Sequence, residues 1–172
     1  MTLRLYTYWR SSAAHRVRIA LNLKRLDYQS IPKHLVRNGG EQRAADYLAV
    51  NPQGLVPALE HDGTVLAQSL AICEYLEEIA PRPALLPGGP RDRAVVRSMA
   101  LSIACDVHPL NNLGVQQYLR REFGQGDEAV SCALAIGQTG AATEQFAAVV
   151  DRSVAVAIHD QQRIACLLYT SR

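Results

Sequence analysis

Two adjacent serines, Ser11 and Ser12, stand where a predicted strand gives way to a predicted helix. Residues 3–8 are rich in β-formers, and the apolar residues after the serines follow helical spacing. The first N–H groups of a helix are unpaired and carry the positive end of its dipole, so they favour an anion, including a thiolate. A serine hydroxyl there could donate a hydrogen bond to a bound sulfur. The alternative is that the serines only cap the helix, a common role for serine.

Charged side chains surround the serine pair. Arg10 directly precedes it and could bind the carboxylates of a substrate through paired hydrogen bonds. Arg16 and Arg18 follow within the predicted helix, where we expect solvent to surround their charges. The apolar face of the same helix carries one polar residue, Lys24.

The first half of the chain predicts a thioredoxin-like α/β domain. After the first strand and helix, we expect a strand over 26–32, a turn at 38–40, a short helix over 41–48, hairpin strands over 55–60 and 64–66, and a helix over 69–79. The pair Asn51-Pro52 must end the short helix, and Asp62-Gly63 marks the hairpin turn. This element order favours a parallel first strand pair joined by a right-handed crossover.

The second half of the chain predicts an all-α domain. Residues 81–90 are rich in proline and glycine and indicate a linker. Beyond it, residues 91–123 show the spacing of a long helix that is interrupted or bent near Pro109, and residues 129–150 and 153–168 are also helical in pattern. We therefore predict a thioredoxin-like domain over residues 1–80, a linker over 81–90 and a helical domain over 91–172.

Composition narrows the classes of partner. Of 172 residues, 48% are hydrophobic, and 18 basic and 16 acidic residues are interspersed, which argues against nucleic-acid binding. No apolar run reaches the length of about 18 residues that a membrane span needs, and no secretory signal is apparent, so we expect a cytoplasmic protein. The cysteines lack Cys-x-x-Cys spacing, which predicts reduced thiols and no metal site; they are Cys73, Cys105, Cys132 and Cys166.

Several motifs together closely resemble the zeta class of glutathione transferases, and within it the maleylacetoacetate and maleylpyruvate isomerases. They are Ser11-Ser12 with Arg-Val-Arg-Ile-Ala-Leu-Asn-Leu-Lys over 16–24, Asn-Pro-Gln-Gly-Leu-Val-Pro-Ala-Leu over 51–59, Gln-Ser-Leu-Ala-Ile-Cys-Glu-Tyr-Leu-Glu-Glu over 68–78, and Cys-Asp-Val-His-Pro-Leu-Asn-Asn-Leu over 105–113. The resemblance implies the transferase architecture, here incomplete, and glutathione as a cofactor.

The resemblance also implies which residues meet glutathione. Gln68 and Ser69 open a helix whose donors suit the γ-glutamyl carboxylate, although Ser69 could be a plain cap. Val56-Pro57 matches a cis-proline turn whose preceding backbone pairs with the cysteinyl unit. Two further matches, Gln53 and His34, reach the glycyl end in the maleylpyruvate isomerase branch. A single histidine after a strand can equally be a surface residue.

His108 and Asn112 are spaced four apart, which would place them on one helical face. The family implies that they line the mouth of the site, with Asn112 reaching across a dimer contact. The alternative is a polar stripe that closes a groove between helices. A homodimer is expected if the helical domain is intact.

The implied reaction is cis–trans isomerisation of a maleyl diketo acid, with Ser11, Arg10 and Ser12 as the catalytic residues. Position 13 is Ala, where zeta enzymes often carry cysteine, but the attacking sulfur belongs to glutathione and isomerisation needs no protein thiol. Two alternatives stay open: a general conjugating or dehalogenating transferase, which consumes glutathione, and a non-catalytic module of the same fold that binds a protein partner.

The resemblance ends at about Val130. We interpret the residues beyond it as the product of a shifted reading frame or a truncated gene. The alternative is a genuinely divergent helical tail, because helical spacing survives there.

Overall fold

The computed structural model describes residues 2–109 and 111–131, which fall into two units. The first unit takes in the described residues up to Leu85, and the second begins at Leu86. Among the described residues, no helix is both long enough and apolar enough to cross a membrane. The predicted helices over 129–150 and 153–168 lie almost wholly outside the described residues, as do Cys132 and Cys166.

The first unit is built on a four-stranded sheet with the order β2-β1-β3-β4. Its elements are β1 (Leu3–Thr7), α1 (Ser12–Leu23), β2 (Tyr28–Pro32), the 3-10 turns η1 (Arg37–Gly39) and η2 (Glu41–Arg43), α2 (Ala45–Val50), β3 (Ala58–His61), β4 (Thr64–Ala67) and α3 (Ser69–Ile79). Strand β1 pairs in parallel with β2 and antiparallel with β3, and β4 completes a hairpin with β3. The predicted thioredoxin-like fold is confirmed.

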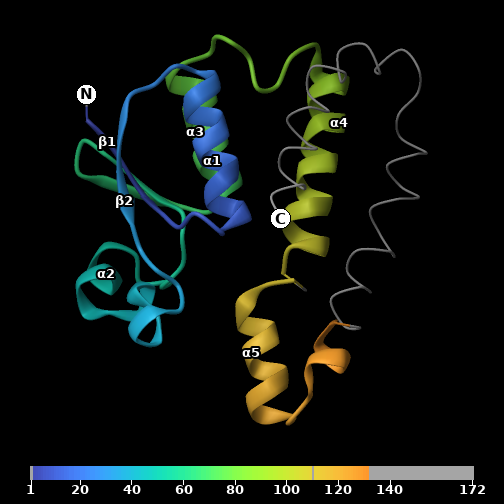
Figure 1. The fold of residues 1–172 in the computed structure, drawn as a ribbon. Helices are drawn as coiled ribbons and strands as arrows, with labels where there is room; N and C mark the ends of the chain where they lie inside the picture. Colours follow the sequence, from blue (N-terminus) through green and yellow to red (C-terminus); the bar gives the residue numbers. More distant parts are fainter. Residues whose placement is uncertain (1, 110, 132–172) are drawn as a thin grey trace. The chain divides into compact units, whose positions relative to one another are not determined.

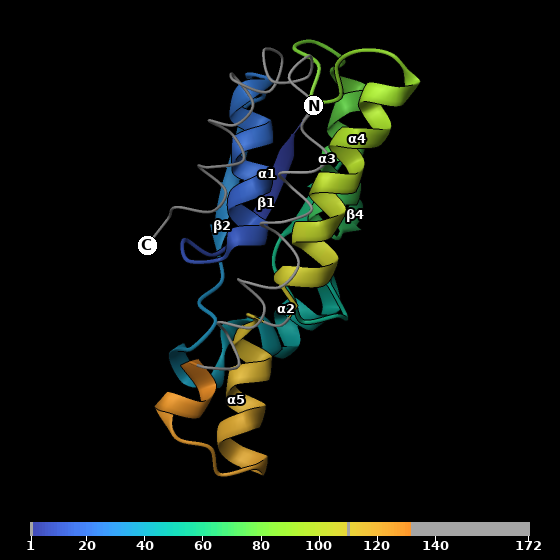
Figure 2. The same cartoon turned by 90° about the vertical axis from the view of Figure 1, so that its right-hand side faces the viewer.

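Apolar side chains cover both faces of the sheet. On one face, Leu5 of β1 and Leu59 of β3 are buried in a cluster with α1 and α3. On the other face, Tyr6 and Ala58 pack against Tyr47 of α2. Figure 1 shows α1 and α3 together beside the sheet with α2 apart from them, and Figure 2 shows α1 in front of β1 and β2. Because alternate residues of a strand point to opposite faces, the two central strands, β1 and β3, are buried on both sides.

The hairpin between β3 and β4 forms where the sequence places it. Asp62 and Gly63 have φ values of 47° and 82°, and His61 pairs with Thr64 across the turn. Two consecutive residues with positive φ are the signature of the type I′ turn, which Asp-Gly adopts readily. The hairpin delivers the chain directly into the start of α3.

The short helix before β3 differs from its predicted range of 41–48. The structure has the 3-10 turn η2 first, then an extended Ala44 (φ −69°, ψ 147°), and only then α2. The helix ends at Val50 because Asn51, which precedes Pro52, is extended (φ −134°, ψ 99°). The extended Ala44 thus separates one predicted helix into two pieces.

The described part of the second unit is helical. Its elements are α4 (Pro90–Leu101), the π-helical segment η3 (Ser102–Val107) and α5 (Leu113–Glu122). Asp92 caps α4 by accepting a hydrogen bond from the Gly89 N–H at 3.1 Å, and Asn112 caps α5. The helix predicted over 91–123, interrupted or bent near Pro109, consists of these three segments, and the predicted interruption lies at Pro109, between η3 and α5.

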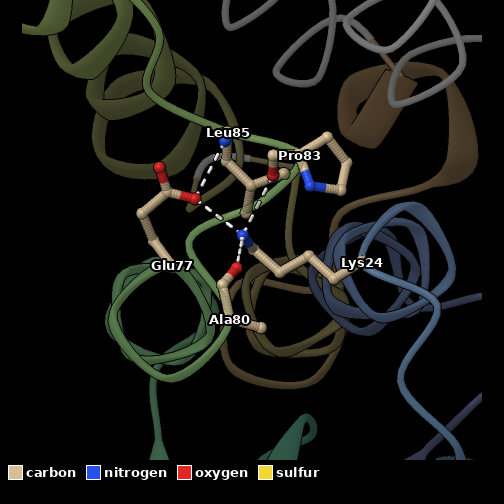
Figure 3. A network of polar contacts seen from close by, with 5 residues as sticks. All are labelled: Lys24, Glu77, Ala80, Pro83 and Leu85. Carbon is tan, nitrogen blue, oxygen red and sulfur yellow. Dashed lines mark hydrogen bonds and ion pairs between the residues drawn. The ribbon is translucent and has the colours of Figure 1, made fainter.

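A buried lysine joins α1 to α3 (Figure 3). The Nζ of Lys24, whose side chain is 0% exposed, lies 2.7 Å from Oε2 of Glu77 and also donates to the carbonyl oxygens of Ala80 and Pro83. The same Glu77 oxygen accepts a hydrogen bond from the Leu85 N–H at 2.9 Å. This network, Lys24–Glu77 with its three backbone partners, ties both helices to the segment that leaves the first unit.

Replacing Lys24 should therefore destabilise the fold strongly. We expect Lys24→Met to lower the free energy of unfolding by about 3–5 kcal/mol, because it removes one member of a buried ion pair and the hydrogen bonds that Lys24 donates. The double variant Lys24→Met, Glu77→Gln should lose less, because both charges of the ion pair are removed and Gln can still accept from Leu85. Urea unfolding monitored by circular dichroism measures all three proteins.

The matched control is Arg120→Met, which breaks a pair with the exposed Asp127 (N···O 2.9 Å) and should change stability little. A loss for Lys24→Met no larger than that of this control would show that the network does not stabilise the fold.

Candidate active site

Ser11 is the N-cap of α1, and its Oγ accepts a hydrogen bond from the Ala14 N–H at 3.2 Å. The capping alternative therefore describes part of its role. Because Oγ is the acceptor in this bond, its own O–H remains a donor. The first turn of α1 contains no acidic residue, so the positive end of the helix dipole is not offset there. Ser11 can cap the helix and still donate to an anionic sulfur.

Arg18 holds the end of β1 in place ahead of Ser11. Its guanidinium donates to Oγ1 of Thr7 at 2.7 Å and to the carbonyl oxygens of Tyr8 and Trp9 at 3.1 and 3.3 Å. Burial lowers the pKa of Arg18, which nevertheless stays charged at neutral pH. Burial, and then the charge of Arg18, also lower the pKa of His15. The expectation that solvent surrounds Arg18 is wrong, since it bonds to three groups of the preceding strand end.

Arg10 is exposed next to Ser11, and its guanidinium carbon lies 5.6 Å from the centre of the Trp9 ring. Trp9 itself is 72% exposed. Ser12, the first residue of α1, follows Ser11 directly. The three residues predicted to be catalytic thus form one short segment with one cation and two hydroxyl groups.

The start of α3 is built differently from that of α1. Its N-cap is Gln68 (φ 69°), whose side chain makes no capping hydrogen bond, and its first turn has no acidic residue. Ser69 is not a plain cap, because its Oγ accepts a hydrogen bond from Nη1 of Arg16 at 2.5 Å. Arg16 is only 9% exposed, so the expectation that solvent surrounds its charge is also wrong. The first N–H groups of α3 thus lie beside a buried positive charge, as an anion site requires.

The turn before β3 reaches the start of α3 through two glutamines. Nε2 of Gln68 donates to Oε1 of Gln53 at 3.1 Å, and the Gln53 N–H donates to Oδ1 of Asn51 at 3.2 Å. Nδ2 of Asn51 in turn donates to the Leu55 carbonyl at 2.9 Å. The bond between Val56 and Pro57 that follows is cis. This turn and the start of α3 therefore contain four of the residues predicted to bind glutathione, namely Gln53, Val56, Pro57 and Gln68.

His34 organises the turn after β2. Its Nδ1 accepts hydrogen bonds from the backbone N–H groups of Val36 and Arg37 at 3.2 and 2.9 Å. The backbone N–H of His34 donates to Oε2 of Glu41 at 2.7 Å. Its ring also packs edge-on against Tyr8 with the ring centres 4.9 Å apart. Because Nδ1 is an acceptor here, the ring proton is on Nε2. His34 shapes this turn, and its role toward glutathione stays a prediction.

His108 and Asn112 do not share a helical face. The segment η3 ends at Val107, and Asn112 is extended (φ −68°, ψ 144°) with its Oδ1 accepting from the Gly114 N–H at 3.1 Å. Pro109 lacks the N–H that a continuous helix needs. The i,i+4 inference was therefore wrong, and Asn112 is the cap of the next helix.

Sequence reasoning missed that Arg16 is buried and bonded to Ser69 at the start of α3. The available signal was its spacing, since Arg16 is four residues before the buried Ala20 and lies next to the buried Val17. Arginines are exposed so often that this spacing was read as a solvated position.

The thiol of Cys73, one turn after Ser69 in α3, is not activated. Burial raises the pKa of Cys73 to about 11, and the positive charge of Arg16 only partly opposes this shift. Cys73 is therefore a protonated thiol packed beside the core. Within the described part of the chain, no cluster of His, Cys, Asp or Glu could hold a metal ion.

Comparison with known proteins places this geometry in a family. Residues 10–79 match the model of the glutathione S-transferase N-terminal domain. The chain is 53% identical to a maleylacetoacetate isomerase of Pseudomonas aeruginosa, covering 84% of this chain and 69% of that protein. It is 47% identical to a maleylpyruvate isomerase of a Ralstonia species, covering 75% of this chain and 60% of the relative. The chain thus spans about three fifths to two thirds of these relatives.

Solved structures agree with the sequence comparisons. The holo structure of a maleyl pyruvate isomerase, described as a bacterial zeta-class glutathione S-transferase, superposes with a TM-score of 0.73 at 43% identity, covering 80% of this chain and 65% of that one. A maleylacetoacetate isomerase of Methylobacterium extorquens, with malonate and glutathione bound, has a TM-score of 0.73 at 47% identity, with 78% and 62% of the two chains covered. The chain belongs to the zeta-class glutathione S-transferase family, within the group of maleylacetoacetate and maleylpyruvate isomerases.

Proposed function

We propose that the protein is a glutathione-dependent cis–trans isomerase that acts on a maleyl diketo acid, such as maleylacetoacetate or maleylpyruvate. The observation that carries the proposal is the pairing of two helix starts in one unit. Ser11 at α1 keeps a hydroxyl proton to donate, and α3 begins without a side-chain cap beside the buried Arg16. Relatives named for these two reactions support the choice of substrate class.

The donors present fit the chemistry of glutathione. Its α-carboxylate matches the open N–H groups and Ser69 at the start of α3, and its thiolate matches the start of α1. Gln53 and Gln68 supply amide groups beside α3, where a peptide can pair. We propose Val56, Pro57 and His34 as further contacts, on the strength of the family motif that they match.

Bound glutathione supplies a nucleophilic sulfur that adds reversibly to the substrate double bond, which can then rotate as a single bond before elimination. Ser11 favours the ionised sulfur by donating a hydrogen bond from its hydroxyl group to it, and the α1 dipole adds to that effect. No protein thiol takes part, so Ala13 is compatible with activity. Glutathione is regenerated and is not consumed, which distinguishes this reaction from conjugation.

Arg10 is the proposed partner of the substrate carboxylates. Its exposed guanidinium stands next to Ser11 and presents several donors in a fork that matches a carboxylate. The same charge stabilises the negative charge that develops on the diketo acid during addition. Ser12 adjoins both residues and completes the proposed catalytic segment. His108 and Asn112 are proposed to line the mouth of the site.

A cytoplasmic location is proposed for this protein. Both cysteines in the described residues, Cys73 and Cys105, are free thiols, which is consistent with a reducing compartment. A glutathione-dependent reaction also needs the reduced tripeptide.

Replacing Ser11 tests the catalytic assignment. We expect both Ser11→Ala and Ser11→Gly to reduce isomerase turnover at neutral pH by about tenfold or more, the scale of losing one charge-stabilising hydrogen bond. Gly is nearly as good an N-cap as Ser, whereas Ala is poor, so the two variants separate the hydroxyl from the cap. Turnover is followed by the disappearance of the cis acid with glutathione present at constant concentration.

Ser30→Ala, at an exposed position of β2, is the matched control and should turn over normally. If Ser11→Gly is as active as the parent while Ser11→Ala is impaired, Ser11 acts only as a helix cap.

The thiol of Cys73 should be unreactive in the folded protein. At pH 7.5 its raised pKa keeps it protonated, and thiolate is the reactive form. We expect iodoacetamide to modify the exposed Cys105 within minutes and to reach Cys73 only after unfolding in urea. Peptide mass spectrometry measures both sites in one sample. Equal rates of modification at the two cysteines in the folded protein would contradict a partly buried, protonated Cys73 thiol.

A homodimer is proposed because the family resemblance implies one. Light scattering should then give a molar mass twice that of the 18.9 kDa chain. A molar mass of 18.9 kDa at every concentration measured would exclude the dimer. The isomerase proposal would then be tested by the activity assays alone.

A further inference from the structure

We propose that Arg16 is a positioning residue for glutathione: from within the interface of α1 and α3 it orients the Ser69 hydroxyl toward the γ-glutamyl carboxylate. The inference rests on the proposed function and adds a residue that touches no ligand. Its support is the placement of one buried guanidinium against one hydroxyl at the start of a helix.

The position of Arg16 calls for an explanation. It belongs to the buried face of α1, together with Ala14, Val17, Ala20 and Leu21, and is 9% exposed. Burying a guanidinium is costly unless it is hydrogen-bonded or paired, so an arginine is retained in such a place for a specific use. One hydrogen bond of Arg16 reaches Ser69, 53 residues away in sequence.

The direction of the hydrogen bond determines what Ser69 can do. A guanidinium has no acceptor, so Nη1 donates and Oγ of Ser69 accepts. The hydroxyl proton of Ser69 is then left to point away from Arg16 and to donate to another group. A hydroxyl that accepts from a cation becomes a stronger donor, because hydrogen bonds in a chain polarise one another. Ser69 is thereby prepared to bind an anion.

The surroundings of Ser69 favour an anion in the same place. The preceding Gln68 makes no capping hydrogen bond, and the first turn of α3 has no acidic side chain. The positive charge of Arg16 also acts on Cys73, one turn further along α3, where it lowers the pKa of the thiol against the larger effect of burial. The helix dipole and the guanidinium therefore add at this end of the helix.

The test compares glutathione with cysteinylglycine, which lacks the γ-glutamyl unit, by calorimetric titration of the full chain. We expect Arg16→Met to weaken glutathione binding by about tenfold or more, the order of one lost hydrogen bond involving a charged group, and to leave cysteinylglycine binding unchanged. Ser69→Ala should show the same selective loss. The double variant should be no weaker than either single variant, because both remove the same interaction.

Two further variants separate positioning from folding. Arg16→Lys keeps a positive donor and should recover part of the preference for glutathione, while Arg91→Met, at an exposed position of α4, should bind both peptides as the parent does. If Arg16→Met does not fold, the comparison of Arg16→Lys with Ser69→Ala still decides the matter, because Ser69→Ala should lose the preference for glutathione and Arg16→Lys should keep only part of it.

The outcomes distinguish the two proposals. A parent chain that binds no glutathione overturns the proposed function and this inference with it. A parent that binds glutathione, with Arg16 variants that keep its preference over cysteinylglycine, overturns this inference alone. A loss of affinity for both peptides alike would likewise overturn it and show that Arg16 only supports the fold.

Discussion

The hydrogen bonds between α1 and α3 are the interactions on which the first unit depends. Arg16 of α1 and Lys24, the C-cap of that helix eight residues later, reach Ser69 and Glu77, which are eight residues apart on α3. The equal spacing fixes the two helices in parallel, with contacts about 12 Å apart along each axis at the rise of an α-helix. Apolar packing alone would allow the helices to slide, whereas a buried charge has to meet its partner.

This alignment has a direct consequence for the candidate site. Because α1 and α3 run in the same direction, their N-termini lie at the same end, and the positive ends of both dipoles with them. Ser11 opens one helix and Gln68 with Ser69 opens the other. A tripeptide with a thiolate and a carboxylate fits two such starts. The contact that aligns the helices near this end, between Arg16 and Ser69, belongs to the candidate site itself.

The sequence predicted those features of the fold that depend on local patterns. The strand and helix order, the Asp62-Gly63 hairpin and the end of α2 before Pro52 all follow from residues close together in the chain. The serine at the start of α1 was also recognisable, since N-caps have a local signature.

The errors concern partners that are distant in sequence or depend on irregular backbone. The sequence pattern predicts that Arg16 and Arg18 are solvated, and both predictions are wrong. Arg16 bonds to Ser69, 53 residues away, and Arg18 bonds to the irregular end of the preceding strand. The pairing of His108 with Asn112 assumed a regular helix, whereas the chain has a π-helical segment that ends before Pro109. Helical spacing alone does not reveal either kind of feature.

The most direct measurement of the central claim is a crystal structure of the full chain with reduced glutathione. The account predicts the cysteinyl sulfur within hydrogen-bonding distance of Ser11 Oγ and the γ-glutamyl carboxylate on the Ser69 hydroxyl at the start of α3. Glutathione bound elsewhere on the chain, or density for it missing at both helix starts under saturating conditions, would contradict the account.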